Sequence, residues 1–191
     1  MLLAQGGGAP SAWVQRFAPL IRSGGTVLDV ACGSGRNLRW LAARGFAVTG
    51  VDRDAEAVAP LLALAEVVVA DIEAGTWPLA GRRFDAIVVA NYLWRPLWPA
   101  LMAALAPGGV YIHETFADGQ QFVGRPTRAD FLLRRGELLQ VCASLRVVAF
   151  EDGFEAATAR HVQRIVAVNE APELAIGSGE PPRYALAGSA G

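Results

Sequence analysis

Short apolar runs, mostly β-branched, alternate along the chain with longer segments in which apolar residues recur every three to four positions. The short runs predict buried strands, and the longer spacing predicts helices. Strands are predicted at residues 26–30, 46–51, 66–70, 86–90, 110–116, 146–151 and 160–169. Helices are predicted at about 11–22, 37–43, 54–64, 96–105 and 137–145. The strand at 86–90 is apolar throughout, as a sheet covered on both faces requires, so the pattern predicts an α/β fold.

The first predicted strand runs into a turn of small residues. Gly33 and Gly35 bracket Ser34, and helical spacing begins at Asn37. This order of strand, glycine turn and helix is the opening of a βαβ unit. Glycine permits positive φ and lets a ligand approach without meeting a Cβ atom. Because the start of the next helix also offers free N–H groups, we expect a small ligand to lie against this turn.

The residues around the turn narrow the choice of ligand. Leu38 stands where the dinucleotide fingerprint has its third glycine, and no lysine follows the glycines as a phosphate-binding loop would require. The second predicted strand ends at Asp52. A carboxylate at that position accepts hydrogen bonds from a ribose diol. A ribose site without a pyrophosphate site favours an adenosine-type ligand such as S-adenosylmethionine.

The run D-V-A-C-G-S-G-R-N and the later run V-T-G-V-D resemble motifs I and II of class I S-adenosylmethionine-dependent methyltransferases. The resemblance extends over about residues 26–169. It implies a Rossmann-like, doubly wound sheet of seven strands, mostly parallel with an antiparallel last strand, and helices on both faces. We expect one domain over residues 1–169 and a flexible tail over residues 170–191. The helix at about 11–22 is expected to cover the sheet edge, with a lid over the cofactor as the alternative.

The resemblance makes S-adenosylmethionine the expected cofactor and suggests how it is bound. Asp71, after the third predicted strand, is expected near the adenine amine, with a turn-capping role as the alternative, and Ile72 is expected on the adenine ring. The expected cofactor-binding residues are Asp29, Ala31, Cys32, Gly33, Gly35, Arg36, Asn37, Asp52, Arg53, Asp71, Ile72 and Asn91.

Methyl transfer from S-adenosylmethionine requires few catalytic groups from the protein. A sulfonium methyl group is already activated, so in-line displacement needs alignment and exclusion of water, and a base only when the nucleophile carries a proton. No catalytic residue is therefore assigned, and the candidates are Asn91, Tyr92 and His113. The alternatives are a turn-making role for Asn91 and a structural role for His113.

The segments A-N-Y-L-W-R-P, I-H-E-T-F and G-R-P-T-R-A-D-F-L-L-R-R-G-E-L resemble a small bacterial branch of tellurite-resistance and thiol methyltransferases. That resemblance implies a small substrate, either a thiol or a metalloid oxyanion. The expected substrate-binding residues are Tyr92, Trp94, Arg95, His113, Glu114 and Arg125. The arginines at 125–135 form either a solvated face or an anion-binding lid. Alternative functions are a nucleic-acid or protein methyltransferase, a non-catalytic cofactor-binding protein and an NAD(P)-dependent Rossmann protein.

Composition restricts these functions further. Hydrophobic residues make up 53% of the 191 residues and charged residues 18%, which is typical of one globular domain. A net charge of −1 argues against a bulk nucleic-acid binder. Cys32 and Cys142 have neither metal-ligand nor disulfide-framework spacing, so no metal is expected. No membrane span and no secretory signal is evident, so we expect a cytoplasmic protein, as a monomer or homodimer.

Overall fold

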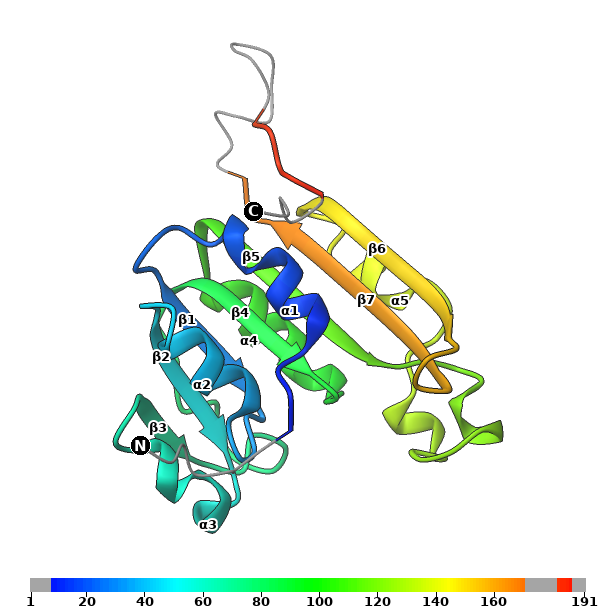
Figure 1. Cartoon of the computed structure of the whole chain (residues 1–191), viewed down its shortest axis with the longest axis horizontal. Helices are drawn as coiled ribbons and strands as arrows, with labels where there is room; N and C mark the ends of the chain where they lie inside the picture. Colours follow the sequence, from blue (N-terminus) through cyan, green and yellow to red (C-terminus); the bar gives the residue numbers. More distant parts are fainter. Residues whose placement is uncertain (1–7, 171–181, 187–191) are drawn as a thin grey trace.

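A single mixed sheet organises the computed structural model, which describes residues 8–170 and 182–186 (Figure 1). Its strand order is β3-β2-β1-β4-β5-β7-β6. Strands β1 to β5 pair in parallel, whereas β7 is antiparallel to both β5 and β6. The strands are β1 Thr26–Val30, β2 Ala47–Asp52, β3 Glu66–Val69, β4 Phe84–Ala90, β5 Leu105–Phe116, β6 Arg146–Glu155 and β7 Arg160–Val168. The predicted fold class is therefore confirmed.

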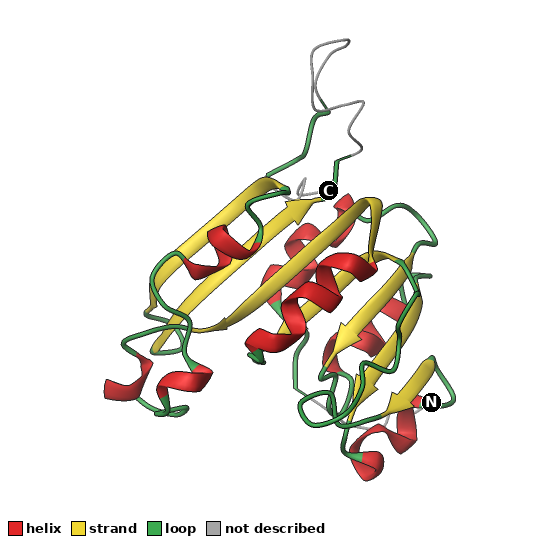
Figure 2. Cartoon of the chain, turned by 180° about the vertical axis from the view of Figure 1, so that it is seen from behind, coloured by secondary structure: helices red, strands yellow, loops and turns green. Residues whose placement is uncertain are grey.

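Helices cover both faces of the sheet, which gives three layers (Figures 1 and 2). One face carries α1 and α2, whose Trp13, Phe17, Leu38 and Leu41 form one buried cluster with the sheet. The other face carries α4 and α5 around a second cluster that includes Leu101. The α-helices are α1 Ala12–Phe17, α2 Arg36–Ala42, α3 Ala55–Val58, α4 Trp98–Ala104 and α5 Glu137–Val141. Short 3₁₀ turns are η1 Ala18–Leu20, η2 Ala59–Leu61, η3 Arg95–Leu97, η4 Gln120–Phe122 and η5 Ala129–Phe131.

In two of the helices that are shorter than predicted, a proline explains the difference. The helix expected at 11–22 ends at Phe17 and continues as η1, which contains Pro19. The helix expected at 54–64 ends at Val58 and continues as η2, which contains Pro60. Proline lacks an N–H donor and its ring clashes with the preceding turn, so regular α-helix does not continue through it.

The first helix lies against the sheet. Trp13 is buried, packs edge-on against Phe17, and donates its indole N–H to the Ile165 carbonyl on β7 at 3.2 Å. The helix therefore covers β7, an inner strand next to the edge strand β6, and not the sheet edge as expected. Most of the expected tail, residues 171–181 and 187–191, lies outside the described residues. Within the described part, Tyr184 donates to Glu170 at 3.1 Å and Arg16 of α1 donates to the Leu186 carbonyl at 3.0 Å.

Candidate active site

The carboxyl ends of the parallel strands meet at one edge of the sheet, where ligands of open α/β sheets bind. Residues that follow or end β1, β2, β3 and β4 line a cavity of about 230 Å³ there. Its lining residues are Ala31, Asp52, Arg53, Ala70, Asp71, Ile72, Glu73 and Tyr92. Most of these residues were expected from the sequence, but Ala70 and Glu73 were not.

The turn after β1 adopts left-handed backbone conformations. Ala31, Gly33 and Gly35 have φ values of +52°, +52° and +80°. A Cβ atom on Gly35 would lie 2.5 Å from Leu61, so this glycine is required by packing as well as by its dihedral angle. A Cβ atom on Gly33 would meet nothing within 4 Å. The turn therefore presents bare backbone and open space at Gly33.

The acid that ends β2 is held against this turn. Asp52 accepts a hydrogen bond from the Gly33 N–H on Oδ2 at 2.7 Å and another from the Asp54 N–H on Oδ1 at 3.0 Å. Each carboxylate oxygen has two lone-pair sites, so both oxygens retain capacity for a ligand hydroxyl. The carboxylate is thus oriented at the mouth of the cavity.

Asp29, near the end of β1, is a buried acid with altered acidity. It is 2% exposed, and burial raises its pKa to about 7, although the Leu38 N–H and the charge of Arg36 favour the ionised form. Its Oδ2 has no hydrogen-bond partner among the described residues. A buried polar atom without a hydrogen-bond partner is unfavourable. In native structures such an atom often binds a ligand or a water molecule.

Three of the four such buried atoms in residues 8–170 and 182–186 surround the glycine turn or line the cavity: Asp29 Oδ2, Arg36 Nη2 and the Tyr92 hydroxyl. The fourth, Arg164 Nε, lies further along the sheet. A buried acid beside a partly buried guanidinium matches the ammonium and carboxylate groups of an amino acid. The donor set therefore fits the methionine part of S-adenosylmethionine, and Asp52 fits its ribose.

Two residues expected at the cofactor use their side chains elsewhere. Cys32 is buried in the core, its Sγ would lie 2.9 Å from a Cβ atom on Gly50, and burial raises the pKa of its thiol to about 12. Asn37 is buried and accepts a hydrogen bond from the Ser11 N–H at 2.9 Å. Both side chains hold the turn and α1 in place, which leaves only their backbone for a ligand.

Asp71 and Tyr92 both line the cavity. Asp71 is exposed and caps the following turn, because its Oδ1 accepts from the N–H groups of Glu73 and Ala74 at 2.9 and 3.2 Å. The Tyr92 hydroxyl has its pKa raised, first by burial and then by the charge of Glu73. Glu73 lies two residues after Asp71. It can be recognised as a cavity residue only when the conformation of this turn is known.

His113 lies beneath the site instead of in it. Its ring is 1% exposed, with Nε2 3.1 Å from the Tyr92 carbonyl and Nδ1 2.9 Å from the Tyr111 hydroxyl. Since a carbonyl only accepts, Nε2 carries the proton and Nδ1 accepts from the hydroxyl. Burial lowers the pKa of His113 to about 4. Because both ring nitrogens are engaged, His113 has no free nitrogen for a substrate. These contacts favour the structural role that was the alternative for His113.

Asn91 follows β4 in a turn conformation. Its φ is +57°, its side chain is exposed, and its N–H donates to the Glu114 carbonyl at 2.9 Å. Asparagine tolerates the left-handed region better than most residues, so the turn-making alternative has direct support. The exposed amide at the carboxyl edge still leaves Asn91 as a candidate to contact cofactor or acceptor.

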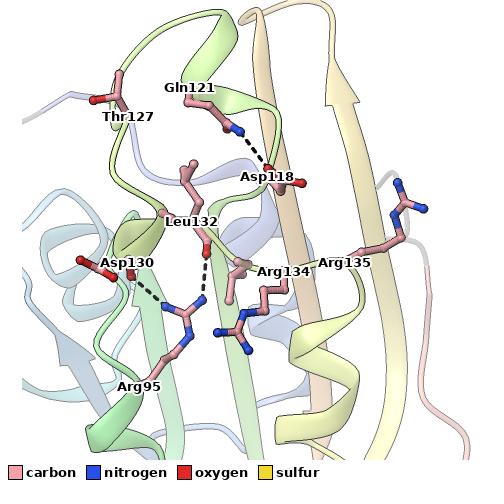
Figure 3. A pocket seen from close by; sticks show the side chains of 10 residues that line it. Arg95, Asp118, Gln121, Thr127, Asp130, Leu132, Arg134 and Arg135 are labelled. Atoms are coloured by element: carbon pink, nitrogen blue, oxygen red, sulfur yellow. Dashed lines mark hydrogen bonds between the residues drawn. The ribbon is translucent and has the colours of Figure 1, made fainter.

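Arg95 is a clamp within the protein. Its guanidinium donates to both carboxylate oxygens of Glu137 at 2.7 and 2.8 Å. It also donates to the carbonyls of Asp130 and Leu132, each at 2.8 Å (Figure 3). These contacts join η3, η5 and α5. They leave Arg95 little capacity to bind substrate directly, contrary to the role expected for it.

A second cavity, of about 250 Å³, lies beside this clamp (Figure 3). It was not expected from the sequence as a unit, because its residues come from three separate segments. Arg135 points away from Arg95, whereas the side chain of Arg134 lies beside it. The lining residues are Arg95, Asp118, Gln121, Thr127, Ala129, Asp130, Leu132, Leu133, Arg134 and Arg135.

The other expected substrate residues do not gather at one place. Trp94 packs against the core cluster that contains α4 and α5. Arg125 is exposed, and its carbonyl accepts from the Gln120 amide at 3.0 Å. Glu114 is buried between Arg36 and Arg164.

The described residues carry no group of three or more His, Cys, Asp or Glu side chains suited to hold a metal ion. No helix among these residues is long and apolar enough to cross a membrane.

Comparison with known proteins identifies the class. The sequence matches the family described as methyltransferase domain over residues 3–159, so the chain belongs to that family. It is a class I S-adenosylmethionine-dependent methyltransferase, structurally similar to TehB-like enzymes. No curated protein matches the sequence significantly.

Solved structures with the same fold have low sequence identity. TehB from Haemophilus influenzae is 20% identical with a TM-score of 0.63, over 80% of this chain and 60% of TehB. The chain thus spans less than two thirds of TehB. A TehB-like methyltransferase from Corynebacterium glutamicum is 23% identical with a TM-score of 0.56, over 78% of this chain and 85% of that one. The N-methyltransferase NodS from Bradyrhizobium japonicum is 19% identical with a TM-score of 0.62, over 81% and 93%.

Proposed function

We propose that this methyltransferase transfers the methyl group of S-adenosylmethionine to a small molecule bound at the carboxyl edge of the sheet. The observation that carries the cofactor part is the combination of an open glycine turn, an oriented Asp52 carboxylate and two buried polar atoms without partners. A small acceptor is supported by the net charge of −1, which argues against a nucleic acid, and the second cavity, of about 250 Å³, is the site proposed for it.

Each part of the cofactor has a proposed partner. The Asp52 carboxylate accepts from the ribose hydroxyls, and Gly33 lets the nucleoside approach the backbone. Asp29 accepts from the ammonium group, and Arg36 donates to the carboxylate. Arg53, Asp71, Ile72 and Glu73 line the space proposed for adenine, and Ala31, Gly35 and the backbone of Cys32 and Asn37 shape the turn around it.

The bound cofactor supplies an activated methyl group that departs from sulfur as the acceptor attacks in line. The protein's own residues bind the two reactants, align them and exclude water. Asn91 and Tyr92 remain candidates to orient the acceptor, because one follows β4 directly and the other lines the cofactor cavity. We assign no general base. A cytoplasmic location and a monomeric or homodimeric state stay predictions from the sequence.

A labelled-methyl transfer screen tests this proposal. The protein is incubated with S-adenosylmethionine labelled at the methyl group and, separately, with small thiols, metalloid oxyanions, tRNA and protein extract. Transfer to one of the small-molecule pools is expected. Labelled tRNA or protein would instead show a macromolecular acceptor. Cofactor binding without transfer to any small molecule would contradict the proposed reaction.

A further inference from the structure

Glu114 lies between two arginines, a position that its expected role as a substrate-binding residue does not explain. Its carboxylate is 11% exposed and lies between two guanidinium groups, with Oε1 3.9 Å from Arg36 Nη2 and Oε2 3.3 Å from Arg164 Nε. The strand register places Glu114 opposite Ala90 of β4 and Arg164 of β7. It therefore stands next to the strand whose end borders the cofactor site.

Arg164 is itself fixed from the far side. Its guanidinium, 14% exposed, pairs with Glu151 at 3.2 Å and with Glu155 on the edge strand β6. Glu155 also pairs with Arg160 at 2.8 Å. Because two further carboxylates hold Arg164, its position does not depend on Glu114. The charges of Glu155, Arg164, Glu114 and Arg36 thus alternate in sign from the edge strand to the glycine turn.

The contact between Glu114 and Arg36 differs from an ordinary closed ion pair. At 3.9 Å it is too long for a hydrogen bond, and Arg36 Nη2 has no hydrogen-bond partner in the described part of the chain. Arg36 Nη1 reaches the Ala9 carbonyl at 3.3 Å. Glu114 therefore attracts the guanidinium and restricts it without consuming the Nη2 donors.

We propose that Glu114 is a positioning residue that holds Arg36 ready for the carboxylate of the cofactor's methionine part. The inference rests on the proposed function, since it takes Arg36 as the carboxylate partner. A long arginine side chain loses rotamer freedom when it binds an anion, and this loss opposes binding. A neighbouring charge that restricts the side chain beforehand removes part of that loss. Arg164 prevents Glu114 from remaining an unpaired buried charge.

A competing role for Glu114 would change carboxylate affinity in the opposite direction. If Glu114 competed with the cofactor for Arg36, its neutralisation would free the guanidinium and strengthen carboxylate binding. If Glu114 positions Arg36, its neutralisation weakens carboxylate binding. The direction of the change therefore decides between the two.

Isothermal titration with two ligands measures this direction. S-adenosylhomocysteine carries the carboxylate, and its decarboxylated analogue retains the ammonium group but lacks the carboxylate. The readout is the ratio of their Kd values, which a general loss of folding or of nucleoside binding does not move. We expect Arg36→Ala to reduce the preference for the carboxylate at least ~10-fold, and Glu114→Gln to reduce it ~3- to 10-fold.

A double variant tests whether Glu114 acts through Arg36. In the Arg36→Ala background, Glu114→Gln is expected to leave the ratio unchanged. The matched control is Glu66→Gln, which removes a carboxylate paired with Arg82 at 2.7 Å at the amino end of β3 and is expected to leave the ratio at its wild-type value. Circular dichroism of each variant checks that it folds.

Two results would overturn the positioning role. One is an unchanged or increased preference for the carboxylate in Glu114→Gln. The other is an equal effect of that substitution with and without Arg36. Absence of S-adenosylhomocysteine binding to the wild-type protein would instead contradict the proposed function, so the two failures are distinguishable.

Discussion

The Gly33 N–H donates to the Asp52 carboxylate at 2.7 Å, which ties the turn after β1 to the acid that ends β2. Because β1 and β2 pair in parallel from Thr26↔Ala47 to Val30↔Val51, their carboxyl ends are adjacent. The bond orients the carboxylate without any side chain from the turn. The proposed recognition of a ribose beside bare backbone rests on this one relationship.

Open space at Gly33 predicts that a methyl group there blocks the cofactor. Gly33→Ala is expected to abolish measurable S-adenosylhomocysteine binding in an isothermal titration, because the added Cβ occupies the space against the turn. Its φ of +52° adds a backbone cost of about 1–2 kcal/mol.

The control for this variant is Gly45→Ala. Gly45 has a φ of +83° and also has nothing within 4 Å of an added Cβ, but it lies in the turn between α2 and β2. Both variants should lose similar thermal stability, and only Gly33→Ala should lose binding. Equal binding by the two variants would count against the proposed cofactor position.

The acidity of Asp29 predicts a pH-dependent affinity. With a pKa of about 7 in the free protein, Asp29 is increasingly protonated below neutrality, and a protonated acid does not attract an ammonium group. The Kd of S-adenosylhomocysteine should rise about tenfold from pH 8 to pH 6. Asp29→Asn should bind more weakly and lose this dependence. A wild-type Kd that is constant over this range would exclude Asp29 as the ammonium partner.

Burial of neutral His113 predicts that acid destabilises the fold. Its pKa is about 4 in the folded protein and about 6.5 when unfolded, so the unfolded chain binds the proton more readily between these values. The associated stability is present above pH 6.5 and is lost as the pH falls to 4, an effect of about 3 kcal/mol. Urea unfolding at pH 7 and pH 4 should show this loss in the wild type beyond that in His113→Gln. Identical pH dependence in both proteins would contradict the neutral, buried imidazole.

The contacts of Arg95 predict that its removal destabilises the fold. Arg95→Ala removes four hydrogen bonds and leaves the Glu137 side chain, 9% exposed, without its cation. The free energy of unfolding should fall by about 3–5 kcal/mol in a denaturant titration. Arg82→Ala is the matched control, because it breaks an exposed pair with Glu66 and should lose about 1 kcal/mol or less. Similar losses in both variants would show that Arg95 is not a clamp.

The sequence could predict which residues lie together at the proposed cofactor edge, because that edge is built from strand ends. Asp29, Asp52 and Asp71 each fall at or near the end of an apolar run, and parallel strands bring such ends together. Gly33 and Gly35 could be predicted as turn residues because they directly follow such an apolar run. The local pattern thus contains the information that positions these residues.

The acceptor side could not be predicted in the same way. The direction of Arg95 toward Glu137 depends on how η3, η5 and α5 pack, and no local spacing encodes that contact. His113 is engaged by the Tyr92 carbonyl, a contact that depends on how the chain turns after β4. Glu114 meets Arg36 and Arg164 only across the assembled sheet.

The most direct test of the central claim is a titration of the wild-type protein with S-adenosylhomocysteine, together with Asp52→Asn and its neighbour Asp54→Asn. Asp52 faces the cavity, whereas Asp54 caps α3 by accepting from Glu56 and Ala57. The wild type should bind one equivalent, Asp54→Asn should bind nearly as well, and Asp52→Asn should bind at least ~10-fold more weakly, since hydrogen bonds to a charged group contribute about 1.5–3 kcal/mol. No binding by the wild type, or equal affinity in all three proteins, would contradict the account.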